Sequence, residues 1–185
     1  IETRPIKMIS GISPFCETFF TDVKVPKDQI VGAENAGWDV AKYLLTHERE
    51  MISAGGAALS GGGRALGAVI ADTVRDMDAV LRADAMRCEV DGLALGLTLE
   101  RYKDQAAAGQ GAGDASAMLK YMGTELNKRR HELMMSAGGS DALEWDGPLG
   151  NRAGDWLRTK ANSIEGGTSE VMLSIVSRRI LGLPG

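Results

Sequence analysis

The fold is decided by the stretch Trp38-Asp-Val-Ala-Lys-Tyr-Leu-Leu-Thr-His-Glu-Arg-Glu-Met-Ile-Ser-Ala-Gly-Gly56. At about 100° per residue it forms an amphipathic helix with one apolar face. Glu48 lies in the middle of that face, whereas Glu50 lies on the opposite side; the face also holds Ala41, Leu44, Leu45, Met51, Ile52 and Gly55. A carboxylate facing a core is costly unless it is paired, hydrogen-bonded or protonated, and desolvation makes a carboxylate a better base near neutral pH. Glu48 is therefore predicted to be either a general base or part of a buried ion pair with Arg49 or a distant Arg.

The chain downstream of Asn35 repeats its apolar residues about every 3.6 positions, which predicts helices. The first is expected from about Ala36 to about Asp72, and its glycine-rich second half allows either close approach of another molecule or a break. Further helices are predicted at about 74–108, 114–137 and 155–161, and from about Thr168 onward. Their apolar stripes are interpreted as core, so the fold class is mainly α, an up-and-down four-helix bundle. The expected core stripes are Met77, Leu81, Ala85, Cys88, Leu95, Leu99 and Tyr102, then Ala115, Leu119, Met122, Leu126, Leu133 and Ala137, then Val171, Met172, Ile175, Val176 and Ile180.

In the first 32 residues, apolar and polar residues alternate as they do in β-strands. A half-buried strand is predicted from Phe15 to Val25, with Ile6–Ile9 as its neighbour. An isolated pair of strands is marginal in water, so we expect the rest of the sheet in sequence not present here. The strand-like start at Ile1 likewise suggests a piece of a longer polypeptide.

Composition limits the possible functions. The chain has 185 residues, 44% of them hydrophobic and 25% charged, which suits one globular domain. A net charge of −4 argues against nucleic acid as a partner. Cys16 and Cys88 lack metal-ligand spacing and fit a reducing compartment, so a cytoplasmic location is expected. No membrane span, signal peptide or Glu-x-x-His di-iron pair is predicted.

A second motif, Ile164-Glu165-Gly166-Gly167-Thr168-Ser169-Glu170, opens the last helix. The two glycines permit positive φ angles and close approach of another molecule. Thr168 is the predicted N-cap, and Glu170 suits the positive first turn. Because free N–H groups at a helix start can bind a phosphate or another polar ligand, the motif predicts either a ligand-binding loop or a well-capped helix.

Five stretches in order along the chain together resemble the acyl-CoA dehydrogenase family. They are Phe19-Phe-Thr-Asp-Val-Lys-Val-Pro26, Val31-Gly-Ala-Glu-Asn-Ala-Gly-Trp38, Leu45-Thr-His-Glu-Arg49, Gly167-Thr-Ser-Glu170 and Arg178-Arg-Ile-Leu-Gly182. The resemblance covers nearly the whole chain. It implies that residues 1–34 are the end of a middle β-domain, with two strands, and that residues 35–185 are the C-terminal helical bundle domain.

The resemblance also implies an activity and its site. Members bind FAD, remove the α-proton of an acyl-CoA thioester with a carboxylate and pass the β-hydride to the flavin. The family's base stands either directly before Gly-Thr-Ser, where this chain has Gly166, or in a Glu-Arg pair on the first bundle helix, where it has Glu48-Arg49. Glu48 is thus the implied base, and Glu165, one residue out of register, is the runner-up.

The remaining roles are assigned by the same resemblance. Substrate contacts are expected from Arg49, Glu165 and Arg178. FAD contacts are expected from Gly166, Gly167, Thr168 and Glu170, and no metal is expected. The implied partners are acyl-CoA, an electron-transfer flavoprotein as electron acceptor, and further subunits in a homodimer, homotetramer or heteromer with a related chain. The isolated chain is expected to be inactive.

Two departures from the family favour an alternative function. Residues 64–82 lack the Arg-x-x-Phe-Gly motif that holds a neighbouring subunit's FAD in many members, and Met135 stands about where the family has a Gln. The alternative is a non-catalytic helical subunit, or degenerate homologue, that assembles with an active acyl-CoA dehydrogenase.

Overall fold

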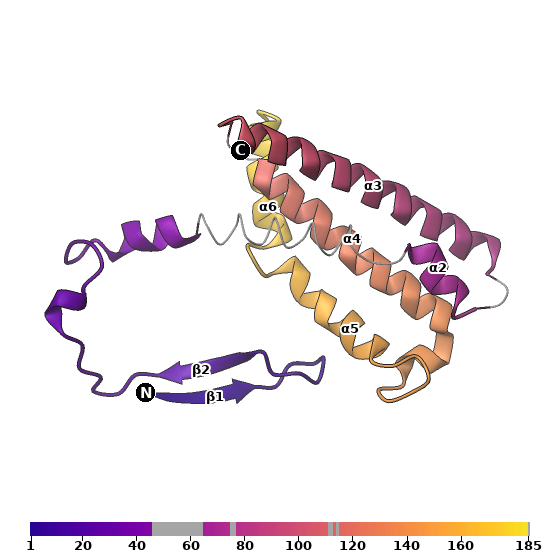
Figure 1. The fold of residues 1–185 in the computed structure, drawn as a ribbon, viewed down its shortest axis with the longest axis horizontal. Coiled ribbons are helices and arrows are strands. Elements are labelled where there is room, and N and C mark those ends of the chain that lie inside the picture. Colours follow the sequence, from indigo (N-terminus) through magenta and orange to yellow (C-terminus); the bar gives the residue numbers. More distant parts are fainter. Residues whose placement is uncertain (46–64, 75–76, 111–112, 114, 185) are drawn as a thin grey trace.

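A computed structural model describes residues 1–45, 65–74, 77–110, 113 and 115–184. A β-hairpin and a short helical stretch at residues 37–45 precede the helical part (Figure 1). The helices of this part are α2 (Leu66–Ala71), α3 (Ala79–Ala107), α4 (Ala115–Gly138), α5 (Arg152–Thr159) and α6 (Ser169–Ile175). Shorter turns of helix are η1 (Lys27–Gln29), η2 (Gly139–Leu143), η3 (Lys160–Ser163) and the π-helical η4 (Val176–Ile180). The predicted fold class, a helical bundle preceded by a short β segment, is confirmed.

The two long helices begin and end at residues whose chemistry sets the boundary. The Asp78 carboxylate caps α3 by accepting hydrogen bonds from the backbone N–H groups of Val80 (2.8 Å) and Leu81 (2.9 Å). The helix therefore starts later than the predicted position 74. It ends before Gly109, whose φ of +78° favours glycine, and α4 ends before Gly139 with a φ of +54°.

The predicted first helix is not continuous. Ala65 has an extended backbone with ψ of 136°, so α2 starts anew at Leu66. The glycine-rich stretch itself lies outside the described residues, and with it the choice between a close approach and a break at those glycines. Leu44 and Leu45, predicted on the core-facing side, are 65% and 37% exposed, because residues 37–45 lie apart from the bundle in Figure 1.

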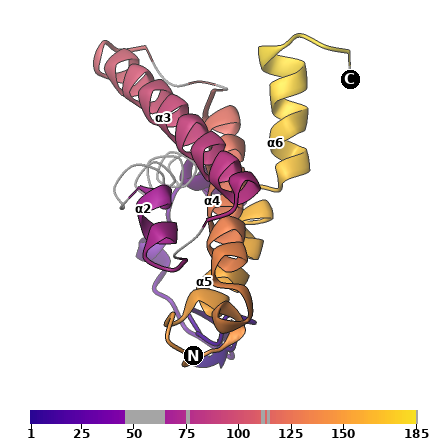
Figure 2. The ribbon, with the colours of Figure 1, turned by 90° about the vertical axis from the view of Figure 1, so that its right-hand side faces the viewer.

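The core lies between α3 and α4, which pack along their lengths, with α2, α5 and α6 also packed on α4 (Figures 1 and 2). One cluster joins α2, α3 and α4 through Leu66, Ile70, Ala85, Cys88 and Leu133, and a second joins α3 and α4 through Leu95, Leu99 and Leu119. These positions confirm the predicted stripes of both long helices. Met122, Val171 and Ile180 were expected in the core but are 47%, 50% and 41% exposed. On α6 it is Met172, 4% exposed, that is deeply buried.

The hairpin pairs β1 (Glu2–Ile6) with β2 (Phe15–Phe19) in antiparallel register. The first strand lies earlier than the predicted Ile6–Ile9, because the chain turns at residues 8–12, where Gly11 has a φ of +83°. The second strand ends before the predicted Val25, and Asp22 turns the chain with a φ of +51°. Every residue of both strands is exposed, as expected for strands without further sheet neighbours.

Candidate functional site

The terminal loop, defined here as residues 162–169, begins in the last two residues of η3, ends at the first residue of α6 and contains the predicted Gly166-Gly167 motif. Thr168 is the N-cap of α6, as predicted, because its hydroxyl accepts a hydrogen bond from the backbone N–H of Val171 (3.2 Å). Glu170 lies exposed in the first turn. A hydrogen bond from its own backbone N–H and one from the Thr168 hydroxyl hold the pKa of the Glu170 carboxyl below its ordinary value. Glu170 therefore remains an anion at neutral pH.

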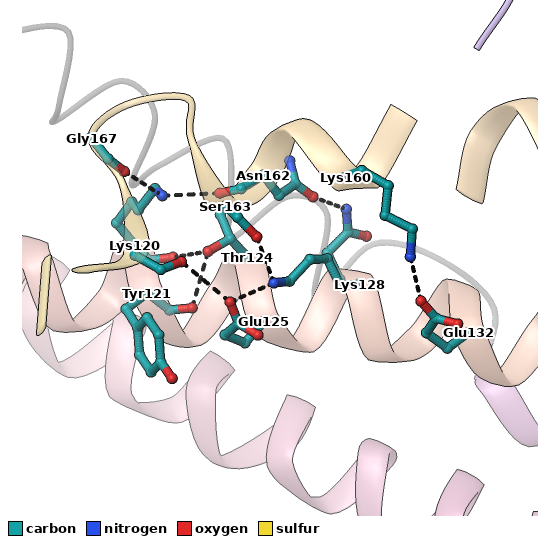
Figure 3. Close-up of polar contacts among 12 residues, drawn as sticks. Lys120, Tyr121, Thr124, Glu125, Lys128, Glu132, Lys160, Asn162, Ser163 and Gly167 are labelled. Atoms are coloured by element: carbon teal, nitrogen blue, oxygen red, sulfur yellow. Dashed lines mark hydrogen bonds and ion pairs between the residues drawn. The ribbon is translucent and has the colours of Figure 1, made fainter. Parts of the chain in front are cut away.

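Lys120 of α4 anchors both ends of the terminal loop (Figure 3). Its ammonium donates hydrogen bonds to the backbone carbonyl of Asn162 (3.0 Å) and to that of Gly167 (2.7 Å), and the residue is only 5% exposed. Burial lowers the pKa of this amine, because desolvation penalises the charged form. The ammonium thus fixes the loop backbone on each side of Glu165 and Gly166.

Further side chains of α4 also contact the terminal loop (Figure 3). Lys128 donates to the Ser163 hydroxyl and forms an ion pair with Glu125, both at 2.7 Å. The Asn127 amide donates to the Asn162 side-chain oxygen at 2.9 Å, and the Ser169 hydroxyl donates to Glu125 at 3.3 Å. One face of α4 therefore presents a polar row that sets the course of the loop.

Glu165, the alternative base, is already bound on both carboxylate oxygens. Oε2 accepts from Arg158 at 2.9 Å, and Oε1 accepts from the Asn162 amide. The side chains of Glu165 and Arg158 are each one-third exposed. These two contacts hold the Glu165 side chain against Arg158 of α5 and Asn162 of η3.

The paired glycines of the loop both adopt the left-handed conformation, with φ of +66° at Gly166 and +100° at Gly167. This confirms the predicted positive φ angles. A Cβ on Gly167 would also lie 2.6 Å from Cε of Met172, the buried residue of α6. The conformation of the loop and the packing of α6 therefore both depend on glycine at this position.

We expect Gly167→Val to lower FAD affinity in the full-length protein while leaving the helical circular dichroism nearly unchanged. Gly139→Val is the matched control, since Gly139 also has a positive φ but has open space around it. Both changes should reduce stability by about 1–3 kcal/mol through backbone strain. Flavin absorbance per protein should fall only for Gly167→Val. Equal flavin content in both variants would mean that the loop serves only as a helix cap.

Arg178, an expected substrate contact, is exposed on η4. It borders an open groove of about 300 Å³ that runs along α6 and η4 and is also lined by Glu170, Val171, Ser174, Ile175 and Arg179. Arg178 and Glu170 thus share one groove, whereas Glu165 and Gly167 lie in the terminal loop. Glu48 and Arg49 lie outside the described residues.

Within the part of the chain that the structure describes, no cluster of His, Cys, Asp or Glu could hold a metal ion. No described helix is long and apolar enough to cross a membrane.

Two residues that hold the terminal loop were not predicted from the sequence. Lys120 and Asn162 are both buried polar residues that anchor the loop. Lys120 lies in the second turn of the helix predicted at about 114–137, directly after Leu119 of the expected core stripe. A lysine beside a core stripe is the one signal that could have pointed to it, since a buried amine requires partners.

Known proteins resemble the chain in both sequence and fold. The family model described as acyl-CoA dehydrogenase, C-terminal domain, matches residues 35–181. Acyl-CoA dehydrogenase FadE34 of Mycobacterium tuberculosis is 33% identical over 185 residues, covering 100% of this chain and 25% of that protein. Acyl-CoA dehydrogenase IpdE1 of the same organism is 29% identical over 189 residues, covering 100% of this chain and 48% of that protein. The chain therefore spans a quarter to about half the length of these curated relatives.

Solved structures share its fold. The Tcur3481-Tcur3483 steroid ACAD aligns with a TM-score of 0.83 and 22% identity, over 99% of this chain and 49% of that one. The ChsE4-ChsE5 complex from Mycobacterium tuberculosis aligns with a TM-score of 0.77 and 24% identity, over 100% of this chain and 50% of that one. With the match over residues 35–181, these findings show that the chain belongs to the acyl-CoA dehydrogenase family.

Proposed function

We propose that this chain is the C-terminal part of an FAD-dependent enzyme that introduces an α,β double bond into an acyl-CoA thioester. The family match over residues 35–181 is the observation that carries this proposal. Residues 1–34 are proposed to be the end of a β-domain and residues 35–185 the helical bundle domain. The full exposure of both strands supports this division, since Ile6, Phe15 and Phe19 need further strands to cover them.

The terminal loop fits the role of one wall of a flavin site. Its two left-handed glycines put no side chain between the backbone and a neighbouring molecule, and Lys120 holds both ends in place. Arg158 adds a buried Nη1 that has no acceptor among the described residues. When bound, FAD would supply the acceptor for the β-hydride. In this proposal Gly166, Gly167, Thr168 and Glu170 form the flavin-facing part of the loop.

Glu48 is the proposed base, because it matches the family's Glu-Arg position and is predicted from the sequence to lie on the apolar face of an amphipathic helix. Its carboxylate would take the α-proton of the thioester, and exclusion of water by the bound acyl chain would make that carboxylate a stronger base. Arg49 and Arg178 are proposed to contact the substrate. Glu165 is the runner-up for the base, and its contacts with Arg158 and Asn162 favour a structural role.

A non-catalytic partner subunit remains the second proposal. The absence of Arg-x-x-Phe-Gly from residues 64–82 supports it. Two of the solved relatives, the Tcur3481-Tcur3483 steroid ACAD and the ChsE4-ChsE5 complex, carry paired names, which also supports this proposal. In either case we propose an electron-transfer flavoprotein as the electron acceptor of the assembled enzyme.

We expect the isolated 185-residue chain to be mostly helical but not to retain FAD. The hairpin lacks sheet neighbours, and the proposed flavin site needs a second wall from the β-domain. The measurement is the ratio of flavin to protein absorbance after purification, with circular dichroism as the control for folding. In the full-length protein the same ratio should approach one flavin per chain. A stoichiometric yellow complex of the isolated chain would show that the other domains are not needed.

A further inference from the structure

The turn of the hairpin, residues 8–12, lies against the helical part of the chain. Of residues 1–45, all of which the structure describes, Ser10 alone is buried, with 3% of its surface exposed. Every residue of β1 and β2 is exposed. Figures 1 and 2 both show the turn beside the loop that joins η2 to α5. The hairpin therefore contacts the helical part through its turn rather than through its strands.

The contact is made between Gly11 and the indole ring of Trp145. A Cβ on Gly11 would lie 3.2 Å from Cζ3, 3.7 Å from Cη2 and 3.9 Å from Cε3 of that ring. Gly11 has a φ of +83°, and the turn is closed by hydrogen bonds from the Met8 N–H to the Ile12 carbonyl and from the Gly11 N–H to the Met8 carbonyl, both at 2.9 Å. Glycine thus allows both the bend of the turn and the close approach of the ring.

The loop that carries the indole ring is closely packed on the end of α4. A Cβ on Gly138 would lie only 2.6 Å from Cβ of Ala142 and 2.7 Å from Cδ1 of Leu149, and Ala142 is fully buried. Gly147 and Gly150 form an antiparallel bridge, in which the Gly150 N–H donates to the Gly147 carbonyl at 3.0 Å. The ring is therefore presented to the turn by a well-supported segment of backbone.

We propose that Trp145 is a positioning residue, whose ring holds the turn at residues 8–12 and so fixes the hairpin relative to the terminal loop. The inference rests on the proposed function, in which the β-domain and the terminal loop form two walls of the flavin site. Trp145 is connected to the terminal loop by α5, whose eight residues span about 12 Å, and by η3. A shift of the turn on the ring would therefore change the spacing of the two walls.

The contact is tested by hydrogen–deuterium exchange of the full-length protein, measured on peptides that contain residues 8–12. Trp145→Ala should speed exchange of the Met8 and Gly11 amides at least about threefold, because the turn loses the ring that covers it. Trp145→Phe keeps an aromatic ring and should retain more protection than Trp145→Ala. Leu143→Ala is the matched control, since Leu143 lies two residues earlier and is 64% exposed. It should keep the wild-type exchange rate.

A pair of glycine variants tests the same contact from the turn. Gly11→Val places a side chain against the ring, whereas Gly109→Val places one at a φ of +78° with open space around it. Both variants strain the backbone to a similar degree. Only Gly11→Val should alter the exchange of peptides that contain residues 144–150, because only this variant pushes on Trp145.

The positioning role is tested by the FAD dissociation constant and by the visible circular dichroism of the bound flavin, at a temperature where thermal unfolding shows every variant to be folded. Trp145→Ala should raise the dissociation constant at least about threefold and alter the flavin spectrum. Trp145→Phe should restore part of both properties, and Leu143→Ala should change neither.

The outcomes separate this proposal from the proposed function. Unchanged exchange of residues 8–12 in Trp145→Ala would overturn the contact. Faster exchange with an unchanged FAD dissociation constant and flavin spectrum would overturn the positioning role. A wild-type protein that binds no FAD would contradict the proposed function and with it the positioning of flavin walls, while the exchange rates would still decide whether Trp145 holds the hairpin.

Discussion

Glu48→Gln in the full-length protein should leave the FAD content unchanged and slow flavin reduction by acyl-CoA at least about 10²-fold. Gln keeps the size of the side chain and most of its hydrogen bonding, but it cannot accept the α-proton. The Glu48→Gln change therefore affects removal of the α-proton rather than binding of FAD. The measurement is the rate at which the absorbance of oxidised flavin disappears after rapid anaerobic mixing with acyl-CoA.

Two matched variants, Glu50→Gln and Glu165→Gln, serve as controls. Glu50→Gln alters an acid that the sequence predicts on the opposite, polar face of the same helix, and this variant should keep the wild-type rate of flavin reduction. Glu165→Gln removes the other candidate base. It should slow flavin reduction far less than Glu48→Gln does, because Glu165 is held by Arg158 and Asn162. If Glu165→Gln abolishes reduction while Glu48→Gln retains it, the base is in the terminal loop. If none of the three variants slows flavin reduction in a protein that contains flavin, Glu48 is a structural acid.

Lys120→Met should destabilise the terminal loop and weaken FAD binding. Met fills a similar volume but leaves the carbonyls of Asn162 and Gly167 without the donor that now lies 3.0 and 2.7 Å away. A buried acceptor that loses its donor costs about 1–3 kcal/mol. We therefore expect a lower free energy of unfolding and an FAD dissociation constant raised at least about tenfold, which corresponds to roughly 1.4 kcal/mol.

The control for this change is Lys128→Met, about two turns further along α4. Lys128 also contacts the loop, through Ser163, but its side chain is 21% exposed and it binds no loop carbonyl. Lys128→Met should leave the FAD affinity within about twofold of the wild-type value. Equal FAD affinity in wild type and Lys120→Met, measured by equilibrium flavin fluorescence, would show that the loop does not need this anchor.

The sequence was most informative where one periodic pattern controls burial. Cys88, Leu95 and Leu133 were expected in the core, and each is buried, because a helix of this length keeps one side against its neighbour. The N-cap at Thr168 was also predictable, since it depends on residues within one turn. Local chemistry of this kind does not depend on the rest of the fold.

Features that depend on distant contacts were not predictable from local pattern. Lys120 reaches carbonyls 42 and 47 residues further along the chain, and nothing in its own helix indicates that contact. The pairing of Glu165 with Arg158 depends on the bend between α5 and the loop. Strand positions shifted because Gly11 and Asp22 turn the chain, and propensity alone does not fix such turns.

If this chain helps to form an acyl-CoA dehydrogenase site, anaerobic titration of the full-length protein with acyl-CoA should reduce its flavin. A panel of straight-chain, branched and ring-bearing acyl-CoA thioesters should include at least one that bleaches the flavin, with one enoyl-CoA formed per flavin reduced. Loss of two hydrogens from the thioester would be read by mass spectrometry. A full-length protein that binds no FAD, or whose flavin is reduced by no acyl-CoA, would contradict the account and leave the non-catalytic partner subunit as the function.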